Sequence, residues 1–322
     1  MSHFVKAACA LALCTAGTAH AQQTYPAKPV RLVVTFPAGG GTDIMARLLG
    51  EKLTQRLGQQ LIIDNRGGAN GNIGMELAAK APPDGYTLVV TTVGTWAVNP
   101  NLYKQMPFDV VKDFAPVIQV SSSPGVLVVH PSMPVKNVKD LVALAKAQPG
   151  KLDYGSAGVG GFGHISGAIF TLMTGTKMVH IPYKGAGPAQ IDLLAGQIQV
   201  LFNDAIPTMP YLRSGRMRGL AVTSIRRMPV LAELPTIDEA GVKGYDNSSW
   251  MAVAAPAGTP KEIVARLNSD FNAVLKMPDI QEKSTAAGAI LVGGTPEQFA
   301  DFLKSELAKF SRVVRDANIT AQ

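Results

Sequence analysis

Residues 33–49 read VVTFPAGGGTDIMARLL, and this stretch decides the fold. An apolar strand is predicted at Leu32–Phe36, a loop of Pro37-Ala38 and three glycines follows, and a helix is predicted to begin at Thr42-Asp43. Consecutive glycines allow backbone N–H groups to turn toward one point without Cβ clashes. The first N–H groups of a helix lack partners within it and carry partial positive charge. The stretch therefore predicts either an anion-binding loop or a tight strand-to-helix connection with Thr42 or Asp43 as its cap.

The first 21 residues have the pattern of a secretory signal peptide. Lys6 precedes an apolar segment, and Ala19-His20-Ala21 has the small-residue pattern of a cleavage site. We expect cleavage after Ala21 and a periplasmic location, and the apolar run is too short to span a membrane. Both cysteines, Cys9 and Cys14, lie in this segment. The mature chain is thus expected to have no disulfide, no thiolate nucleophile and no cysteine metal site.

The bulk composition describes a folded protein that favours small anions. The chain has 322 residues, 47% of them hydrophobic and 16% charged, which suits one large or two medium domains. Its net charge of +7 comes from scattered basic residues, without a basic run or interleaved aromatic residues. This pattern excludes a nucleic-acid footprint and indicates a mild field for anionic ligands.

Apolar runs and amphipathic segments alternate along the chain, with turns between them. Such alternation predicts an α/β protein whose mostly parallel sheets carry helices on their faces. Residues 121–125, Ser-Ser-Ser-Pro-Gly, read as a break between two strands, and two amphipathic helices are predicted to end the chain. The predicted strands are Leu32–Phe36, Leu61–Ile63, Tyr86–Thr91, Val117–Val120, Val126–Val129, Lys151–Tyr154, Val179–Tyr183, Ile198–Phe202, Leu220–Thr223 and Trp250–Ala254.

Two such α/β units are predicted, and the second interrupts the first. We expect residues 22–124 and 247–322 to form lobe 1 and residues 125–246 to form lobe 2, joined by extended crossings near residues 120–128 and 245–254. Ligands of parallel sheets bind outside the carboxyl ends of the strands. The two sets of strand ends are therefore expected to face each other across a cleft.

A second glycine-rich turn follows the strand that ends at Tyr154. Its Gly158-x-Gly160-x-x-Gly163 pattern matches the dinucleotide fingerprint, but no Asp or Glu occurs from Tyr154 to Ile191 to bind a ribose. We therefore predict a backbone cradle for a smaller anion and no cofactor.

Catalytic and metal-binding patterns are weak. His130, His164 and His180 do not share metal-ligand spacing, and Tyr154 replaces the first glycine of a nucleophile elbow around Ser156. A periplasmic hydrolase that uses Ser156 and His164 stays open as the alternative. His164 either faces a ligand or packs and caps the helix that it opens.

Three further polar residues have two interpretations each. Asp43 either caps its helix or orders the N–H groups of the glycine loop. Asp204 follows a strand and either accepts from a ligand hydroxyl, an ammonium or a water, or caps the next helix. Tyr183 is either a ligand donor or a half-buried structural tyrosine.

Several segments in fixed order resemble one family. These are Phe36–Asp43 with Arg47, Gly155–Gly158 through His164, Ile181–Gly185 with Pro188-Ala189, Asp192–Gly196, Pro235–Gly241, and Trp250 with Ala255–Pro260. Together they are similar to the Bug-type extracytoplasmic solute receptors of the tripartite tricarboxylate transporter systems. The resemblance covers essentially the whole mature chain.

This resemblance implies a monomeric, non-catalytic binding protein of the two-lobed type II-like fold. It implies a small carboxylate ligand, such as a di- or tricarboxylate, an amino acid or an aromatic acid, which the protein delivers to membrane permease subunits. The alternative role is that of a ligand-sensing partner of a signalling protein. This chain departs from the family pattern at two positions. Phe162 is bulky where a smaller or polar residue is expected, and Ala168 stands where the family commonly has a glutamate. The candidate ligand-binding residues are Phe36, Ala38, Gly39, Gly40, Gly41, Thr42, Asp43, Thr92, Thr95, Ser156, Gly158, Gly160, Gly161, Phe162, His164, Tyr183 and Asp204.

Overall fold

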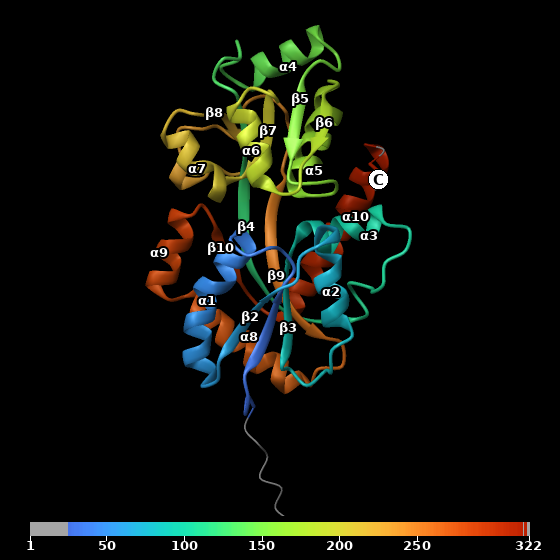
Figure 1. The fold of residues 1–322 in the computed structure, drawn as a ribbon, viewed down its shortest axis with the longest axis vertical. Coiled ribbons are helices and arrows are strands. Elements are labelled where there is room, and N and C mark those ends of the chain that lie inside the picture. The colour runs from blue at the N-terminus through green and yellow to red at the C-terminus, as the bar shows by residue number, and fades with distance from the viewer. Residues whose placement is uncertain (1–24, 318, 321–322) are drawn as a thin grey trace, which may run out of the picture.

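Two α/β lobes lie one above the other and are joined by two long strands (Figure 1). The structure is a computed structural model that describes residues 25–317, 319 and 320. The predicted signal peptide and its cleavage after Ala21 lie outside the described residues. In the part of the chain that is described, no helix is both long enough and apolar enough to cross a membrane.

Each lobe is built on three parallel strands. Strand β1 pairs in parallel with β2 and β3, and β5 pairs in parallel with β6 and β7. Antiparallel strands β9 and β4 join the two sets, so the sheet runs β2-β1-β3-β9-β4-β7-β5-β6, while β8 and β10 pair with β4. The strands are β1 Val30–Val34, β2 Leu61–Asn65, β3 Thr87–Thr92, β4 Phe114–Val129, β5 Asp153–Ser156, β6 Val179–Pro182, β7 Val200–Asp204, β8 Arg218–Val222, β9 Ser248–Pro256 and β10 Ile290–Gly293.

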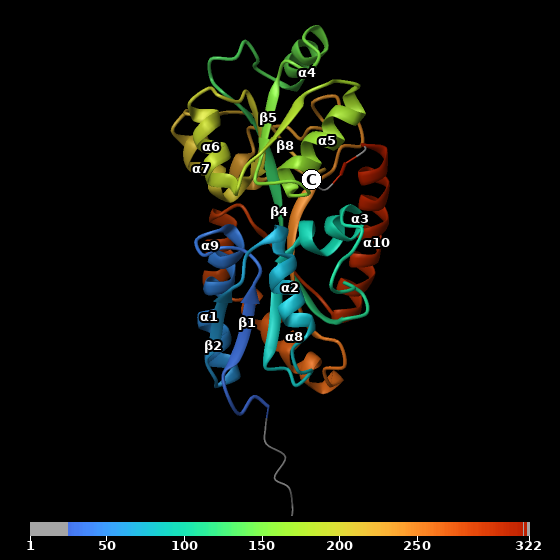
Figure 2. The same ribbon diagram turned by 45° about the vertical axis from the view of Figure 1, so that its right-hand side comes forward.

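Helices cover both faces of each set of strands (Figure 2). Apolar residues of α1 and α8 pack on one face of the first lobe, and those of α2 and α10 pack on the other. In the second lobe α6 and α7 cover one face, and α4 and α5 cover the other. The α-helices are α1 Gly41–Leu57, α2 Asn72–Ala79, α3 Asn99–Leu102, α4 Val138–Ala147, α5 Phe162–Thr174, α6 Ala186–Leu194, α7 Ala205–Arg213, α8 Lys261–Leu275, α9 Pro278–Ala286 and α10 Pro296–Asp316, and short helical turns are η1 Ala69–Gly71, η2 Gly94–Val98 and η3 Pro229–Leu231.

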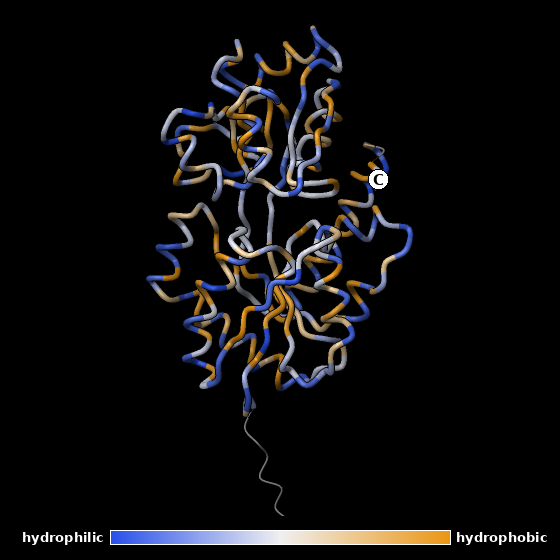
Figure 3. The backbone as a smooth tube through the Cα atoms, viewed as in Figure 1, coloured by the Kyte–Doolittle hydropathy of each residue, from blue (hydrophilic) through white to orange (hydrophobic). Residues whose placement is uncertain are grey.

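Periodic apolar residues form the cores as predicted. The stripe of Met45, Leu49, Leu53 and Leu57 on α1 is buried, and the most hydrophobic segments of the backbone gather in the sheets (Figure 3). The helix after Asn137 is also confirmed, because the Asn137 side chain accepts a hydrogen bond from the N–H of Asp140 and caps α4.

The predicted break at residues 121–125 is wrong. These residues belong to β4, a continuous strand of 16 residues. Residues 114–124 of β4 pair with β9, and residues 125–129 pair with β7 and β8. Neighbouring strands satisfy the backbone of the serine run, and this pairing overrides its turn-like composition.

The C-terminal region also differs from the prediction of two helices. Helix α9 and strand β10 lie between α8 and α10. Only Ile280 and Ser284 of α9 are buried, and Ile290 and Val292 of β10 are half exposed. Neither element therefore has the apolar periodicity that reveals a helix or strand in a sequence.

Candidate ligand-binding site

The two glycine loops lie at the carboxyl ends of parallel strands in facing lobes. The first glycine loop, residues 35–40, joins β1 to α1, and the second glycine loop, residues 157–161, joins β5 to α5. The arrow of β5 points toward the lower lobe in Figure 1, and β1 runs from below toward the upper lobe. The expected arrangement of facing strand ends is therefore present.

Asp43 orders the first glycine loop. Its buried carboxylate accepts a hydrogen bond from the Gly39 N–H at 2.8 Å and from Asn65 Nδ2 at 3.0 Å, and it pairs with Arg47 at 3.0 Å. Burial alone would raise the pKa of Asp43, but the hydrogen bonds from Arg47, Gly39 and Asn65 together lower it. The carboxylate therefore stays ionised and fixes the loop. This supports the loop-ordering interpretation of Asp43.

Neither Thr42 nor Asp43 caps α1, which begins at Gly41 with Gly40 as its N-cap and has no side-chain cap. The uncapped first turn leaves backbone N–H groups for an anion. Ala38, Gly39 and Gly40 are exposed, Phe36 and Gly41 are half-buried, and the Thr42 and Asp43 residues are buried. Contacts of this loop with a ligand thus depend on its backbone.

A third loop, residues 66–71, was not predicted as part of the site but lies beside the first two. The Thr95 hydroxyl donates to the carbonyl of Asn70 at 2.8 Å and accepts from Thr91, and Asn70 and Asn99 bond to each other. Thr95 has no exposed surface, so it supports the loop from behind. Thr92 ends β3 and is half-buried. The Asn-Gly pair at residues 70–71 was the available signal, because a Cβ on Gly71 would lie 2.3 Å from Thr95 Oγ1.

Two stacked histidines fix the second glycine loop. His164 Nδ1 accepts the Gly160 N–H at 3.0 Å, and its ring stacks on that of His180 with 3.8 Å between centroids. Burial lowers the pKa of His164 to about 4, and burial followed by the neighbouring His164 lowers the pKa of His180 to about 3. Both rings are therefore neutral near pH 7. His164 packs and binds the loop backbone, which agrees with the packing alternative.

The Ser156–His164 pair that the hydrolase alternative requires is not formed. Ser156 has no exposed surface, and its hydroxyl is 2.7 Å from Nε2 of His180 rather than bonded to His164. The same hydroxyl accepts the Gly158 N–H at 3.2 Å and lies 3.0 Å from the Gly158 carbonyl oxygen. These bonds hold the turn, and they leave Ser156 without access to a substrate.

The second glycine loop also contacts the opposite lobe. A Cβ on Gly160 would lie 2.4 Å from Leu102 and 3.6 Å from the side-chain oxygen of Asn99. Gly160 also has φ of +74°, a conformation that favours glycine. Gly158 and Gly161 form the rest of the turn, and Phe162 packs its ring on Gly125 of β4. Phe162 therefore covers one of the two crossings between the lobes.

Tyr183 and Asp204 have different surroundings. The half-buried Tyr183 donates its hydroxyl to Asp192 at 2.7 Å, and burial followed by this bond raises its pKa to about 12. The Asp204 side chain does not cap α7, so the capping interpretation is wrong. Its Oδ1 is buried without a hydrogen-bond partner, and burial raises its pKa to about 6 against the effect of a hydrogen bond from Ser249.

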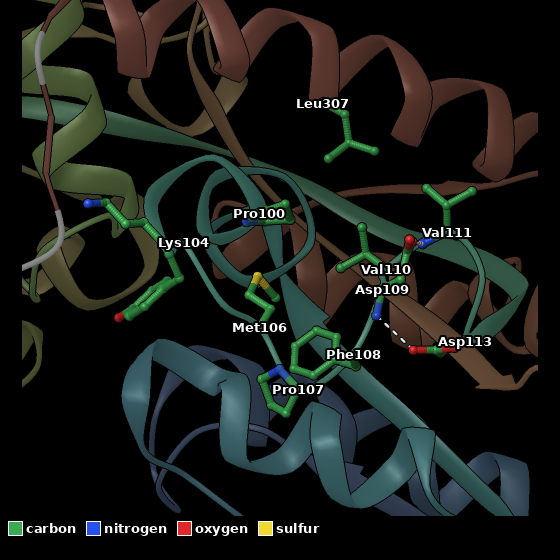
Figure 4. Close-up of a pocket in the computed structure, with 11 residues that line it drawn as sticks. Pro100, Lys104, Met106, Pro107, Phe108, Asp109, Val110, Val111, Asp113 and Leu307 are labelled. Carbon is green, nitrogen blue, oxygen red and sulfur yellow. Dashed lines mark hydrogen bonds between the residues drawn. The ribbon is translucent and has the colours of Figure 1, made fainter.

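A pocket of about 630 Å³ lies outside this arrangement (Figure 4). It opens between the end of α3 and α10, with Met106 and Phe108 on one side and Leu307 of α10 on the other. No candidate ligand-binding residue lines it. Across the described residues, no three histidine, cysteine, aspartate or glutamate side chains gather as a metal site.

Facing strand ends, glycine loops at helix N-termini and two crossing strands define a two-lobed solute-binding protein of the periplasmic type. The chain matches the tripartite tricarboxylate transporter family receptor over residues 45–319, and it belongs to this family. The family predicted from the sequence and the two-lobed fold are thereby confirmed. Members of the family are periplasmic solute receptors.

Named relatives extend this assignment. The chain is 37% identical to protein BugT of Bordetella pertussis over 94% of each chain. It is similar to a solved R. palustris protein with adipate, with 40% identity and a TM-score of 0.87 over 92% of this chain and 99% of that one. It is also similar to MatC from Rhodopseudomonas palustris with bound malate, with 30% identity and a TM-score of 0.83 over 90% of this chain and 100% of that one.

Proposed function

We propose that this protein is a periplasmic receptor that binds a small carboxylate between its two lobes and delivers it to membrane permease subunits. The observation that carries the proposal is the first glycine loop. Asp43 holds the loop backbone, and the uncapped N-terminus of α1 leaves N–H donors beside exposed glycines. Backbone donors of this kind bind an anion without the desolvation cost of a buried lysine or arginine. The adipate and malate of the two R. palustris neighbours support a carboxylate.

One loop supplies too little free energy for tight binding. A helix terminus contributes roughly 0.3–1 kcal/mol, or up to ~2 kcal/mol when partly buried. Micromolar affinity needs about 8 kcal/mol. The proposal therefore requires donors from both glycine loops and closure of the lobes over the ligand. We assign residues 22–124 and 247–322 to one lobe and residues 125–246 to the other.

The individual contacts belong to the same proposal. The N–H groups of Ala38, Gly41 and Thr42 bind one carboxylate, because those of Gly39 and Gly40 already donate to Asp43 and to the Pro37 carbonyl. The loop at Gly158–Phe162 holds the far end of the ligand together with Asp204. Ser156, His164, Tyr183 and Thr95 act indirectly, because their polar atoms already bond to the protein. The protein acts as a monomer and does not change its ligand chemically.

A screen of unmodified acids tests the function. We expect adipate, malate or a related dicarboxylate to raise the melting temperature of the mature protein and to bind with a measurable heat. The same acid must be recovered unchanged after incubation. Stabilisation by none of the mono-, di- or tricarboxylates would refute the proposal, and formation of a product would favour an enzyme.

A further inference from the structure

Buried polar atoms without partners gather where the two lobes join. Among the described residues, six buried side-chain atoms lack a hydrogen-bond partner, and four of them belong to Ser121 and Ser123 on β4, Asp204 on β7 and Asn247 before β9. Such atoms cost free energy when nothing satisfies them. Their concentration at one place indicates that another molecule completes their hydrogen bonds.

Strand register places part of this set on one face. Ser123 lies opposite Ser249 of β9, and Gly125, two residues further along β4, lies opposite Asp204. Directly opposed residues of antiparallel strands point to the same side, as do residues two apart on one strand. Ser123, Ser249 and Asp204 therefore form one group, which we call the crossing cluster. Ser249 hydrogen-bonds to Asp204 across it.

The crossing cluster lies beside the predicted site. A Cβ on Gly125 would be 2.3 Å from the ring of Phe162, so this ring covers the same face next to Asp204. Phe162 is the first residue of α5, directly after the second glycine loop. Asp204 is partly exposed as a residue, while its Oδ1 is enclosed. The carboxyl group of Asp204 therefore lies next to the first residue after the second glycine loop.

Among the described residues, no charged group shifts the pKa of Asp204. Strands β4 and β9 contribute no ionisable side chain, and the pKa of Asp204 is shifted by burial and by the Ser249 hydrogen bond alone. The ionisable residues on the other elements packed against β7 are Asp153 and Tyr154 of β5, His164 of α5, Asp192 of α6, and Tyr211 and Arg213 of α7. Since no cation of the described part of the chain lies beside it, Asp204 is held in surroundings that favour its neutral form.

We propose that Asp204 couples ligand binding to proton uptake, because a ligand carboxylate that enters the crossing cluster must share one proton with it. This inference rests on the proposed function. Two adjacent carboxylates in a buried site do not both ionise, so the pair takes one proton from the solvent and titrates as a unit. The hydroxyl groups of Ser123 and Ser249 donate to the remaining oxygen atoms. Asp204 thereby selects ligands with an acid group at this end.

Calorimetry with adipate tests the coupling. Titrations near pH 7.5 in phosphate and in Tris buffer, which differ in ionisation enthalpy, should show uptake of close to one proton for each adipate bound. Because ligand-free Asp204 is ionised above its pKa of about 6, affinity should fall about tenfold per pH unit above that value. Below it, affinity should level off until the ligand itself is protonated.

Three variants test whether Asp204 is the group that takes up the proton. Asp204→Asn should bind adipate without proton uptake and without the pH dependence. Ser249→Ala should keep the uptake and move its onset to higher pH, because the Ser249 hydrogen bond lowers the pKa of Asp204 and its removal raises that pKa. Asp301→Asn, at an exposed position on α10, is the matched control and should behave as the unmodified protein. Thermal melts establish that each variant folds.

Binding of adipate without proton uptake would overturn the inference and leave the receptor function intact. Unchanged uptake in Asp204→Asn would do the same. Tighter binding of an amino acid, with no proton taken up, would identify Asp204 as an ammonium site and also contradict the coupling. Failure of every carboxylate to bind would instead reject the receptor function, and the coupling with it.

Discussion

Substitution of Gly40 by valine separates the binding role of the first glycine loop from its structural role. Gly40 has φ of −76° and ψ of 165°, an extended conformation that valine adopts readily. A Cβ there would meet only the carbonyl oxygen of Pro37, at 3.4 Å. The valine side chain therefore fits the folded protein, but it occupies the space in front of the α1 N-terminus.

The expected effects differ in size. A hydrogen bond to a charged group is worth about 1.5–3 kcal/mol. Loss of one such contact with a carboxylate weakens binding about tenfold to a hundredfold. Stability should change by less than about 1 kcal/mol, because valine is a poor N-cap but reduces the entropy of the unfolded chain.

Calorimetry with adipate and chemical denaturation measure the two quantities on Gly40→Val. Ala147→Val, at an exposed position near the end of α4, controls for the added side chain. We expect a large rise in Kd with nearly unchanged unfolding free energy in the first variant, and no change of either in the second. Equal losses of affinity and stability would show that the loop is only structural, and an unchanged Kd would place the anion elsewhere.

Further variants test the supports of both loops. Asp43→Asn should lower the unfolding free energy by about 1–3 kcal/mol near neutral pH. Because folding lowers the pKa of Asp43, this difference from the unmodified protein should shrink as pH falls below about 4. Chemical denaturation at several pH values measures it. His164→Ala leaves the Gly160 N–H unpaired and should cost about 1–3 kcal/mol of stability with little change in adipate affinity; a large loss of affinity by calorimetry would make His164 a ligand contact. Gly160→Ala should weaken adipate binding about tenfold, because the added methyl group crowds Leu102 of the opposite lobe. Adding Leu102→Ala should restore part of the affinity in the same titration, and an affinity that does not recover would contradict the contact.

Local signals were sufficient to predict the repeated units of this fold. Apolar stripes such as Met45 to Leu57 and the cap at Asn137 act within a few residues, so they can be read directly from the sequence. The first glycine loop was found because three adjacent glycines have few uses other than a close backbone approach, and the second was found from its Gly158-x-Gly160-x-x-Gly163 pattern. The order of the family segments then identified the two-lobed receptor before any geometry was known.

Distant pairing explains the errors. The serine run at residues 121–125 resembles a turn, and only its pairing with β9, more than a hundred residues away, makes it a strand. Ser156 and His164 are close in sequence, yet the histidine bonded to Ser156 is His180 on the neighbouring strand β6. Ser249 has no local signal in the sequence, because only strand pairing places it opposite Ser123. Such partners are set by topology and do not leave a periodic pattern.

Strand β4 has a consequence for how the protein folds. Its first part is hydrogen-bonded into one lobe and its last part into the other, and the first lobe also requires both the early and the late parts of the chain. A cut at residue 125 would break a strand that both sheets share, so neither half has a complete hydrogen-bonded sheet by itself. The two lobes are therefore expected to unfold in one cooperative transition, and separately expressed lobes should not fold.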